Sequence, residues 1–265
     1  MKALAAFALA LVWSAGAGAQ SSPSLADLDR LYSARQFKAA AQAMFAPRDE
    51  ANARAVLGWA QARLQAGAPH LIGIAYGDLL WQIGEGQRND ALRAEAALVL
   101  VATVLAVASD GAKCADTQAA DARVRQILSA RAAPLHYARS LPSERRARLR
   151  NEALALEQSL AARRPQDVEI CMAGPREIAR QLETPGTVAR EQPLRPGTAA
   201  RTIDIEPGPT YRPEFLAPER WHQRQTLVRQ RFPALLDQLV PLGQINPASR
   251  SATSPLTPHA KAKIT

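Results

Sequence analysis

The chain has 265 residues, and its 33 Lys and Arg against 24 Asp and Glu give a formal net charge of +9. Two cysteines are too few for a disulfide-rich miniprotein, and 14 glycines are too few for a collagen-like repeat. A hydrophobic content of 47% excludes a wholly disordered chain. The length suits one domain, or one domain with a tail.

Residues 1–19 have the pattern of a secretory signal peptide. Lys2 precedes an apolar run over residues 3–12, and a small-x-small cleavage site ends at Ala19. We expect cleavage between Ala19 and Gln20. Arginine outnumbers lysine 28 to 5, as is typical of proteins from GC-rich bacterial genomes. The expected location is therefore the periplasm, with secretion as the alternative.

Residues 96–108 form the most apolar stretch of the remaining chain, between the charges of Glu95 and Asp110. A helix of 13 residues spans only about 20 Å, which is less than the hydrocarbon core of a bilayer. A short helix that is apolar all round is typical of the centre of a soluble domain. We therefore expect no transmembrane segment after the signal peptide.

The sequence predicts an all-α helical domain over residues 20–172. Apolar residues recur at i, i+3, i+4 and i+7, and only four prolines fall within residues 24–164, against fourteen from residue 165 onwards. About seven helices are expected, and the short turns between them predict antiparallel α-hairpins. They begin at Ser24, Gln36, Pro47, Pro69, Asn89 or Asp90, Ala115 and Ser140–Ser143, with a loop at Pro134 before the last.

The stretch LYSARQFKAAAQAMF, residues 31–45, resembles a tetratricopeptide hairpin, with Phe37 and Ala40 at the aromatic and small positions. Leu57-Gly58 is similar to the opening of the next hairpin in tetratricopeptide and Sel1-like repeats. A 34-residue period does not continue, so the resemblance implies stacked α-hairpins rather than membership of the family.

Residues 173–265 are predicted to form a Pro-rich, largely irregular tail. Residues 202–206 alternate as in one short strand without an evident partner, and residues 245–265 have the composition of a disordered end. A helix is expected near 218–240, kinked or split by Pro233. One face of it should dock on the helical domain or on a partner, and the candidate binding residues are Trp221, Val228, Phe232, Leu235 and Leu239.

Cys114 and Cys171 are predicted to form a disulfide. An exported chain with an even number of cysteines favours pairing, and an antiparallel helical hairpin would bring the two positions together. The Cys-x-x-Cys spacing that redox-active sites favour is absent. The bond should therefore be structural.

No residue pattern points to catalysis, a cofactor or a metal. None of His70, His136, His222 and His259 lies three or four residues from another His or Cys, so metal-ligand spacing is absent. We expect surface or helix-capping histidines. Glu85 lies between two glycines and is expected to be a solvated loop carboxylate. No hydrolase, nucleotide-binding or haem-attachment motif is found. The sequence therefore predicts that the protein is not an enzyme.

A basic cluster opens the last helix of the domain and continues at its end, with Arg145, Arg146, Arg148, Arg150, Arg163 and Arg164. It is interpreted as a solvated charged face, with weak attraction to anionic envelope polymers as the alternative. Nucleic acid is disfavoured, because the chain carries a signal peptide and lacks aromatic residues interleaved with the arginines.

The favoured function is a non-enzymatic binding or scaffolding module for an envelope protein or peptide. An open groove rimmed by arginine would support this function. The alternatives are a cell-wall-acting enzyme, with acids converging near Glu85 or His136, and a helical carrier of a small apolar ligand. The carrier requires an apolar cavity beside the 96–108 helix.

Overall fold

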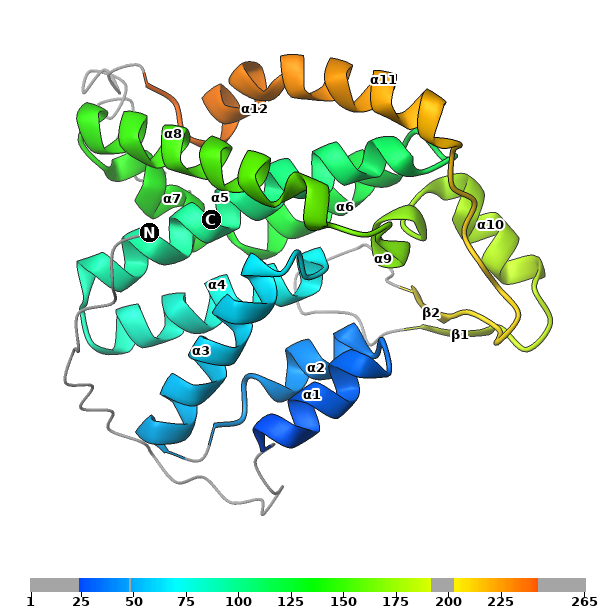
Figure 1. Cartoon of the computed structure of the whole chain (residues 1–265), viewed down its shortest axis with the longest axis horizontal. Helices are drawn as coiled ribbons and strands as arrows, with labels where there is room; N and C mark the ends of the chain where they lie inside the picture. Colours follow the sequence, from blue (N-terminus) through cyan, green and yellow to red (C-terminus); the bar gives the residue numbers. More distant parts are fainter. Residues whose placement is uncertain (1–23, 48, 192–202, 243–265) are drawn as a thin grey trace, which may run out of the picture.

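The computed structural model describes residues 24–47, 49–191 and 203–242, and this part of the chain is mostly helical, which confirms the all-α prediction (Figure 1). The expected cleavage site at Ala19 and Gln20 and the expected disordered end lie outside the described residues. In chain order the elements are α1 (Leu25–Ser33), α2 (Phe37–Ala43), α3 (Glu50–Gln65), α4 (His70–Gly86), α5 (Asp90–Asp110), the 3-10 turn η1 (Gly111–Lys113), α6 (Ala119–Ala130), α7 (Ala132–Ser140), α8 (Ser143–Leu160), the 3-10 turn η2 (Ala161–Arg163), α9 (Val168–Cys171), α10 (Pro175–Glu183), β1 (Val188–Glu191), β2 (Ile203–Glu206), α11 (Pro218–Gln230) and α12 (Phe232–Leu239).

Side-chain caps fix several helix starts. The Ser24 hydroxyl accepts from the backbone N–H of Asp27, whose carboxylate accepts in return from the N–H of Ser24, so that α1 opens with a capping box. Asn89 caps α5, as the sequence predicts. α3 begins at Glu50 instead of at Pro47, because Asp49 supplies its cap.

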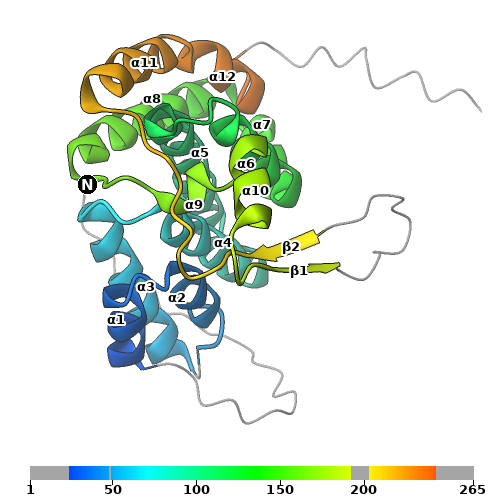
Figure 2. The same cartoon turned by 90° about the vertical axis from the view of Figure 1, so that its right-hand side faces the viewer.

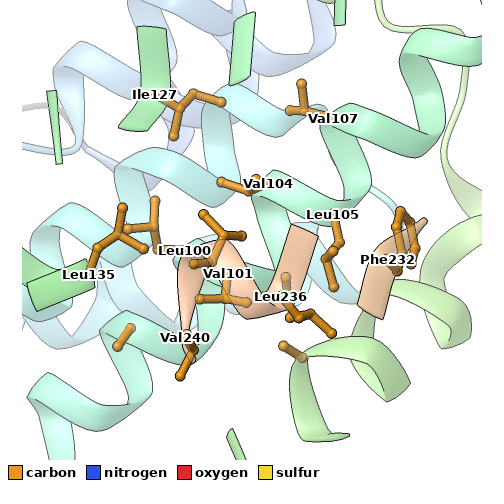
Figure 3. Packing of buried hydrophobic residues seen from close by; sticks show 14 of the residues in the cluster. Leu100, Val101, Val104, Leu105, Val107, Ile127, Leu135, Phe232, Leu236 and Val240 are labelled. Atoms are coloured by element: carbon orange, nitrogen blue, oxygen red, sulfur yellow. The ribbon is translucent and has the colours of Figure 1, made fainter. Parts of the chain in front are cut away.

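Helix α5 lies at the centre of the molecule, as expected for the most apolar segment. Residues 90–113 make the one helix among the described residues with the length and composition to cross a membrane, yet its neighbours bury most of it. α4 lies along one side, and α7, α8 and α12 lie along others (Figure 1). Figure 3 shows the resulting core. Leu100, Val101, Val104 and Leu105 of α5 pack there with residues from other parts of the chain, namely Ile127, Leu135, Phe232, Leu236 and Val240.

The first three helices form a second apolar cluster on α4. Leu28, Met44 and Val56 are fully buried in it. The Trp59 indole N–H donates to Asp29 at 2.7 Å, which ties α3 to α1. α1 pairs with α2 and α3 pairs with α4, so that the first four helices form α-hairpins, in keeping with the weak tetratricopeptide resemblance.

The structure contains helices that the sequence prediction missed. The expected loop at Pro134 is part of α7, because a proline in the first turn of a helix removes only an N–H that has no partner within the helix. α9 is a single short turn, and α10 begins with Pro175 at its first position. The tail is therefore less irregular than predicted.

The expected strand near residues 202–206 has a partner. β2 pairs antiparallel with β1, from Val188 opposite Glu206 to Glu191 opposite Ile203. The expectation of an unpaired strand was therefore wrong. The sequence did not indicate β1 as the partner, because β1 is exposed along its whole length and carries no apolar alternation. Figure 2 shows this two-stranded hairpin projecting from the helical body.

The helix expected near 218–240 is split at Arg231 into α11 and α12, as Pro233 predicts. Both halves pack on the chain's own core, with Phe232 and Leu239 buried. Val228 and Leu235 lie against the same core, and Trp221 is partly buried. The candidate binding stripe thus docks within the chain, which is one of the two expected outcomes.

The basic cluster anchors this tail instead of forming only a solvated face. Arg146 is buried and donates to the carbonyl of Leu242 at 3.1 Å. Arg150 donates to the Val240 carbonyl at 3.1 Å and to Asp237 at 2.6 Å. Part of the positive charge of the sequence therefore has a structural use.

Candidate functional site

A half-enclosed cleft of about 820 Å³ lies between α3 and α4 on one side and α8 on the other, with α5 as its floor. Its walls are largely apolar. The residues that form them include Leu64 of α3, Leu98, Val99 and Ala102 of α5, and Leu149, Leu156 and Leu160 of α8.

The cleft follows one stripe of α5. Ala91, Leu98, Ala102, Ala106 and Asp110 recur along this stripe at helical spacing. The alanine side chains are short, so the space beside this face of α5 stays unfilled between α8 and the α3–α4 pair. The small residues of the most apolar helix therefore create the cleft.

Charged and polar residues surround the outer part of the cleft. Arg145, Arg148 and Glu152 of α8 are exposed there. On α5, Glu95 accepts a hydrogen bond from the Tyr76 hydroxyl at 3.1 Å. Burial raises the pKa of Tyr76, and the negative charge of Glu95 adds to the effect. The rim is thus a mixture of both charges rather than an arginine rim.

A histidine–carboxylate pair lies at the inner end of the cleft. His70 begins α4, and its Nδ1 lies 2.7 Å from Oδ2 of Asp167, which also accepts from the backbone N–H of His70 at 3.1 Å. Both side chains are almost fully buried. The expectation of a surface or ordinary capping histidine was therefore wrong for His70, because its partner lies 97 residues away in the chain. Burial would raise the pKa of Asp167, but its electrostatic interaction and hydrogen bonds with His70 outweigh burial and lower the pKa.

A buried ionic network adjoins this pair. Arg164 contacts Asp110 at 2.6 Å and Glu157 at 2.5 Å. Lys113 lies 3.0 Å from Asp110, and Arg229 of α11 donates to Glu157 at 3.1 Å. Burial raises the pKa of Asp110, and Arg164 and Lys113 act in the opposite direction. The network joins α5, α8 and the tail at the inner end of the cleft.

The predicted disulfide between Cys114 and Cys171 is present, with Cα atoms 5.2 Å apart. It ties α9 to the end of α5, and Asp167 caps α9. The bond therefore helps to hold Asp167 beside His70.

The other residues considered from sequence do not converge on the cleft. Glu85 is exposed and pairs with Arg93 at 3.0 Å. His136 and His222 are exposed, and His259 lies outside the described residues. Among the residues that the structure describes, no group of three or more His, Cys, Asp or Glu is placed to hold a metal ion.

Replacing Asp167 with Asn should lower the free energy of unfolding at neutral pH by about 1–3 kcal/mol, because His70 loses a charged, buried partner. Since the fold lowers the pKa of Asp167, its stabilising contribution is present above the ordinary carboxyl pKa of about 3.9 and is lost as the pH falls through the folded-state value. The difference between the two proteins should therefore shrink from pH 6 to pH 3 in urea titrations. The exposed Asp121→Asn change is the control, and an equal loss at both pH values would contradict the assignment.

No family model, curated protein or solved structure matches this chain.

Proposed function

We propose that this protein is an exported, non-enzymatic binding module that carries a small apolar ligand in the cleft along α5. The observation that supports this proposal is the half-enclosed apolar cleft of about 820 Å³. Sites for small molecules usually enclose about 300–1,000 Å³ and combine apolar walls with a few polar groups. Export rests on the signal-peptide pattern of residues 1–19.

The shape of the cleft favours a linear occupant. Its α5 stripe runs from Ala91 to Asp110, which is about 28 Å at the rise of a helix. A single hydrocarbon chain can follow this stripe along its length.

An extended apolar segment of an envelope protein or peptide is the second candidate. The mixed charges at the rim, with Arg145, Arg148 and Glu152 exposed, support it, because polar rims surround the apolar centres of protein interfaces. A cell-wall-acting enzyme is not proposed, since neither Glu85 nor His136 lines the cleft.

Filling the cleft should abolish ligand binding. Ala106 is a partly exposed alanine on the cleft stripe, and Ala106→Phe would occupy the space above α5. We expect at least about tenfold weaker binding of the neutral fluorescent probe N-phenyl-1-naphthylamine, because the lost apolar contact area corresponds to more than 1.4 kcal/mol. Fluorescence titration measures the change.

The matched control is Ala155→Phe, on the exposed face of α8 and outside the cleft. Equal probe binding by both variants would place the site elsewhere. Native mass spectrometry of the protein purified from its own host then separates the two candidates. A small molecule released by organic solvent supports the carrier, and a bound peptide supports the second candidate.

A further inference from the structure

The inner end of the cleft contains buried hydrogen-bond acceptors that the described part of the protein does not use. His70 and Glu157 both line the cleft. His70 Nε2 and Glu157 Oε2 are buried and have no hydrogen-bond partner among the described residues. Asp110 Oδ1 lies 3.0 Å from the Lys113 ammonium and is therefore partnered. Unsatisfied buried polar atoms are uncommon, and each requires an explanation.

The geometry explains why these atoms are acceptors. Asp167 lies 2.7 Å from His70 Nδ1 and does not line the cleft. In the neutral imidazole the Nδ1–H donates to this carboxylate, so that Nε2 is left as an acceptor. Arg164 and Arg229 both form ion pairs with Oε1 of Glu157, so that Oε2 has no hydrogen-bond partner among the described residues.

The charges at this end are already balanced. Asp167 pairs with His70, while Asp110 and Glu157 pair with Lys113, Arg164 and Arg229. With the neutral imidazole described above, three carboxylates stand against three cations. An ammonium group would add an uncompensated charge in a buried place, which is costly. An anionic group would face acceptor atoms that repel it. An uncharged hydrogen-bond donor meets neither penalty.

We infer that the inner end of the cleft is a subsite for a hydroxyl group at the end of an apolar chain. The hydroxyl donates to His70 Nε2 or to Glu157 Oε2, and the chain lies along the α5 stripe. The ligand class is an uncharged long-chain alcohol or an acyl compound with a hydroxyl head. This inference rests on the proposed function of the cleft. The ends of α4, α5 and α8 that form the subsite lie on the same side of the molecule (Figure 1).

A probe series of constant chain length tests the subsite on the intact, disulfide-bonded protein. We would measure displacement of N-phenyl-1-naphthylamine by 1-decanol, its methyl ether, decanoate and decylammonium. The alcohol should displace the probe at about tenfold lower concentration than the ether, because only the alcohol can donate a hydrogen bond. Both charged compounds should be weaker than the alcohol.

Variants then assign the acceptor. His70→Phe keeps a ring in place and removes the nitrogen acceptor. If Nε2 accepts the hydroxyl, the preference for alcohol over ether should fall towards one in this variant while the affinity for the ether is retained. Glu157→Gln is the second variant, which replaces one of the two carboxylate oxygens by an amide group, and the preference should fall in it if Oε2 accepts the hydroxyl. A preference that stays unchanged in both variants would overturn the subsite. His136→Phe, on an exposed site of α7 outside the cleft, should leave the preference unchanged.

The outcomes separate the subsite from the proposed function. Equal displacement by alcohol and ether would overturn the hydroxyl subsite and leave apolar binding in the cleft intact. Tightest binding of decanoate or decylammonium would overturn it in favour of a charged head group. A protein that binds none of the four compounds, with a probe signal insensitive to Ala106→Phe, would overturn the proposed function and the subsite together.

Discussion

Replacing Arg164 with Met should lower the free energy of unfolding by about 3–5 kcal/mol, the loss expected when one partner is removed from a buried ionic group. Arg164 contacts both Asp110 and Glu157, whose side chains are 5% and 0% exposed. Without it, Lys113 and Arg229 are the remaining cations for these two carboxylates. Urea denaturation followed by circular dichroism measures the loss.

The neighbouring arginine is the matched control for this change. Arg163 is exposed, and its guanidinium donates to the Gln65 carbonyl at 2.7 Å. Arg163→Met should stay within about 1 kcal/mol of the parent protein, as is usual for an exposed side chain with one neutral hydrogen bond. Similar losses at the two positions would mean that the ionic network does not determine stability.

Removing the disulfide by the double change Cys114→Ser and Cys171→Ser should have an effect of similar size. The bond closes a loop with a sequence separation of 57, for which the chain-entropy model gives about 4 kcal/mol. The melting temperature of the variant should fall accordingly, as measured by calorimetry. Free-thiol titration of the unfolded, unreduced parent protein should find no reactive thiols.

The loss should also appear as a local loosening of the tail. Ala115 N donates to the Glu214 carbonyl at 3.0 Å, and Arg224 donates to the Cys114 carbonyl at 2.9 Å, so the tail is bound directly to the disulfide region. Trypsin should cleave at Arg220 and Arg224 faster in the variant than in the parent. Unchanged cleavage at these sites together with a lower melting temperature would contradict the local loosening. It would mean that the bond stabilises the protein only by restricting the unfolded chain.

Local signals in the sequence were sufficient for the helical half of the molecule. Ser24 and Asn89 are side-chain caps, and their positions predict the starts of α1 and α5. The apolar run of residues 96–108 predicts the central helix, and the two cysteines predict their own pairing. The helix predictions depend only on residues that are neighbours in the sequence. The disulfide prediction depends on the number of cysteines, since two cysteines allow only one pairing.

The missed elements have signals that conflict with their surroundings. Pro134 usually marks a loop, but it lies in the first turn of α7, where the missing N–H has no cost. β1 has no buried residue, so its sequence carries no alternating pattern that would identify a strand. In such segments the tertiary contacts decide the local structure.

The candidate site could not be predicted because its parts are distant in the sequence. His70 and Asp167 are 97 residues apart, and neither lies in a recognisable motif. The cleft depends on which face of α5 remains uncovered, and a helix that is apolar all round gives no indication of that face. The alanines at positions 91, 94, 102 and 106 were a usable signal, since small residues on one stripe leave room beside a packed helix.

The covering of α5 by α12 has a consequence for the order in which the molecule is built. Leu100 and Leu105 of α5 share their core with Leu236 and Leu239, which lie more than 130 residues later in the chain. Synthesis proceeds from the N-terminus, so one face of the most apolar helix must wait for more than a hundred further residues before its cover exists. During that interval the nascent chain has an exposed hydrophobic surface at its centre, and contacts of such long sequence separation also form slowly. Among the described helices α12 is the last to be synthesised, and it is therefore the closing element of this core.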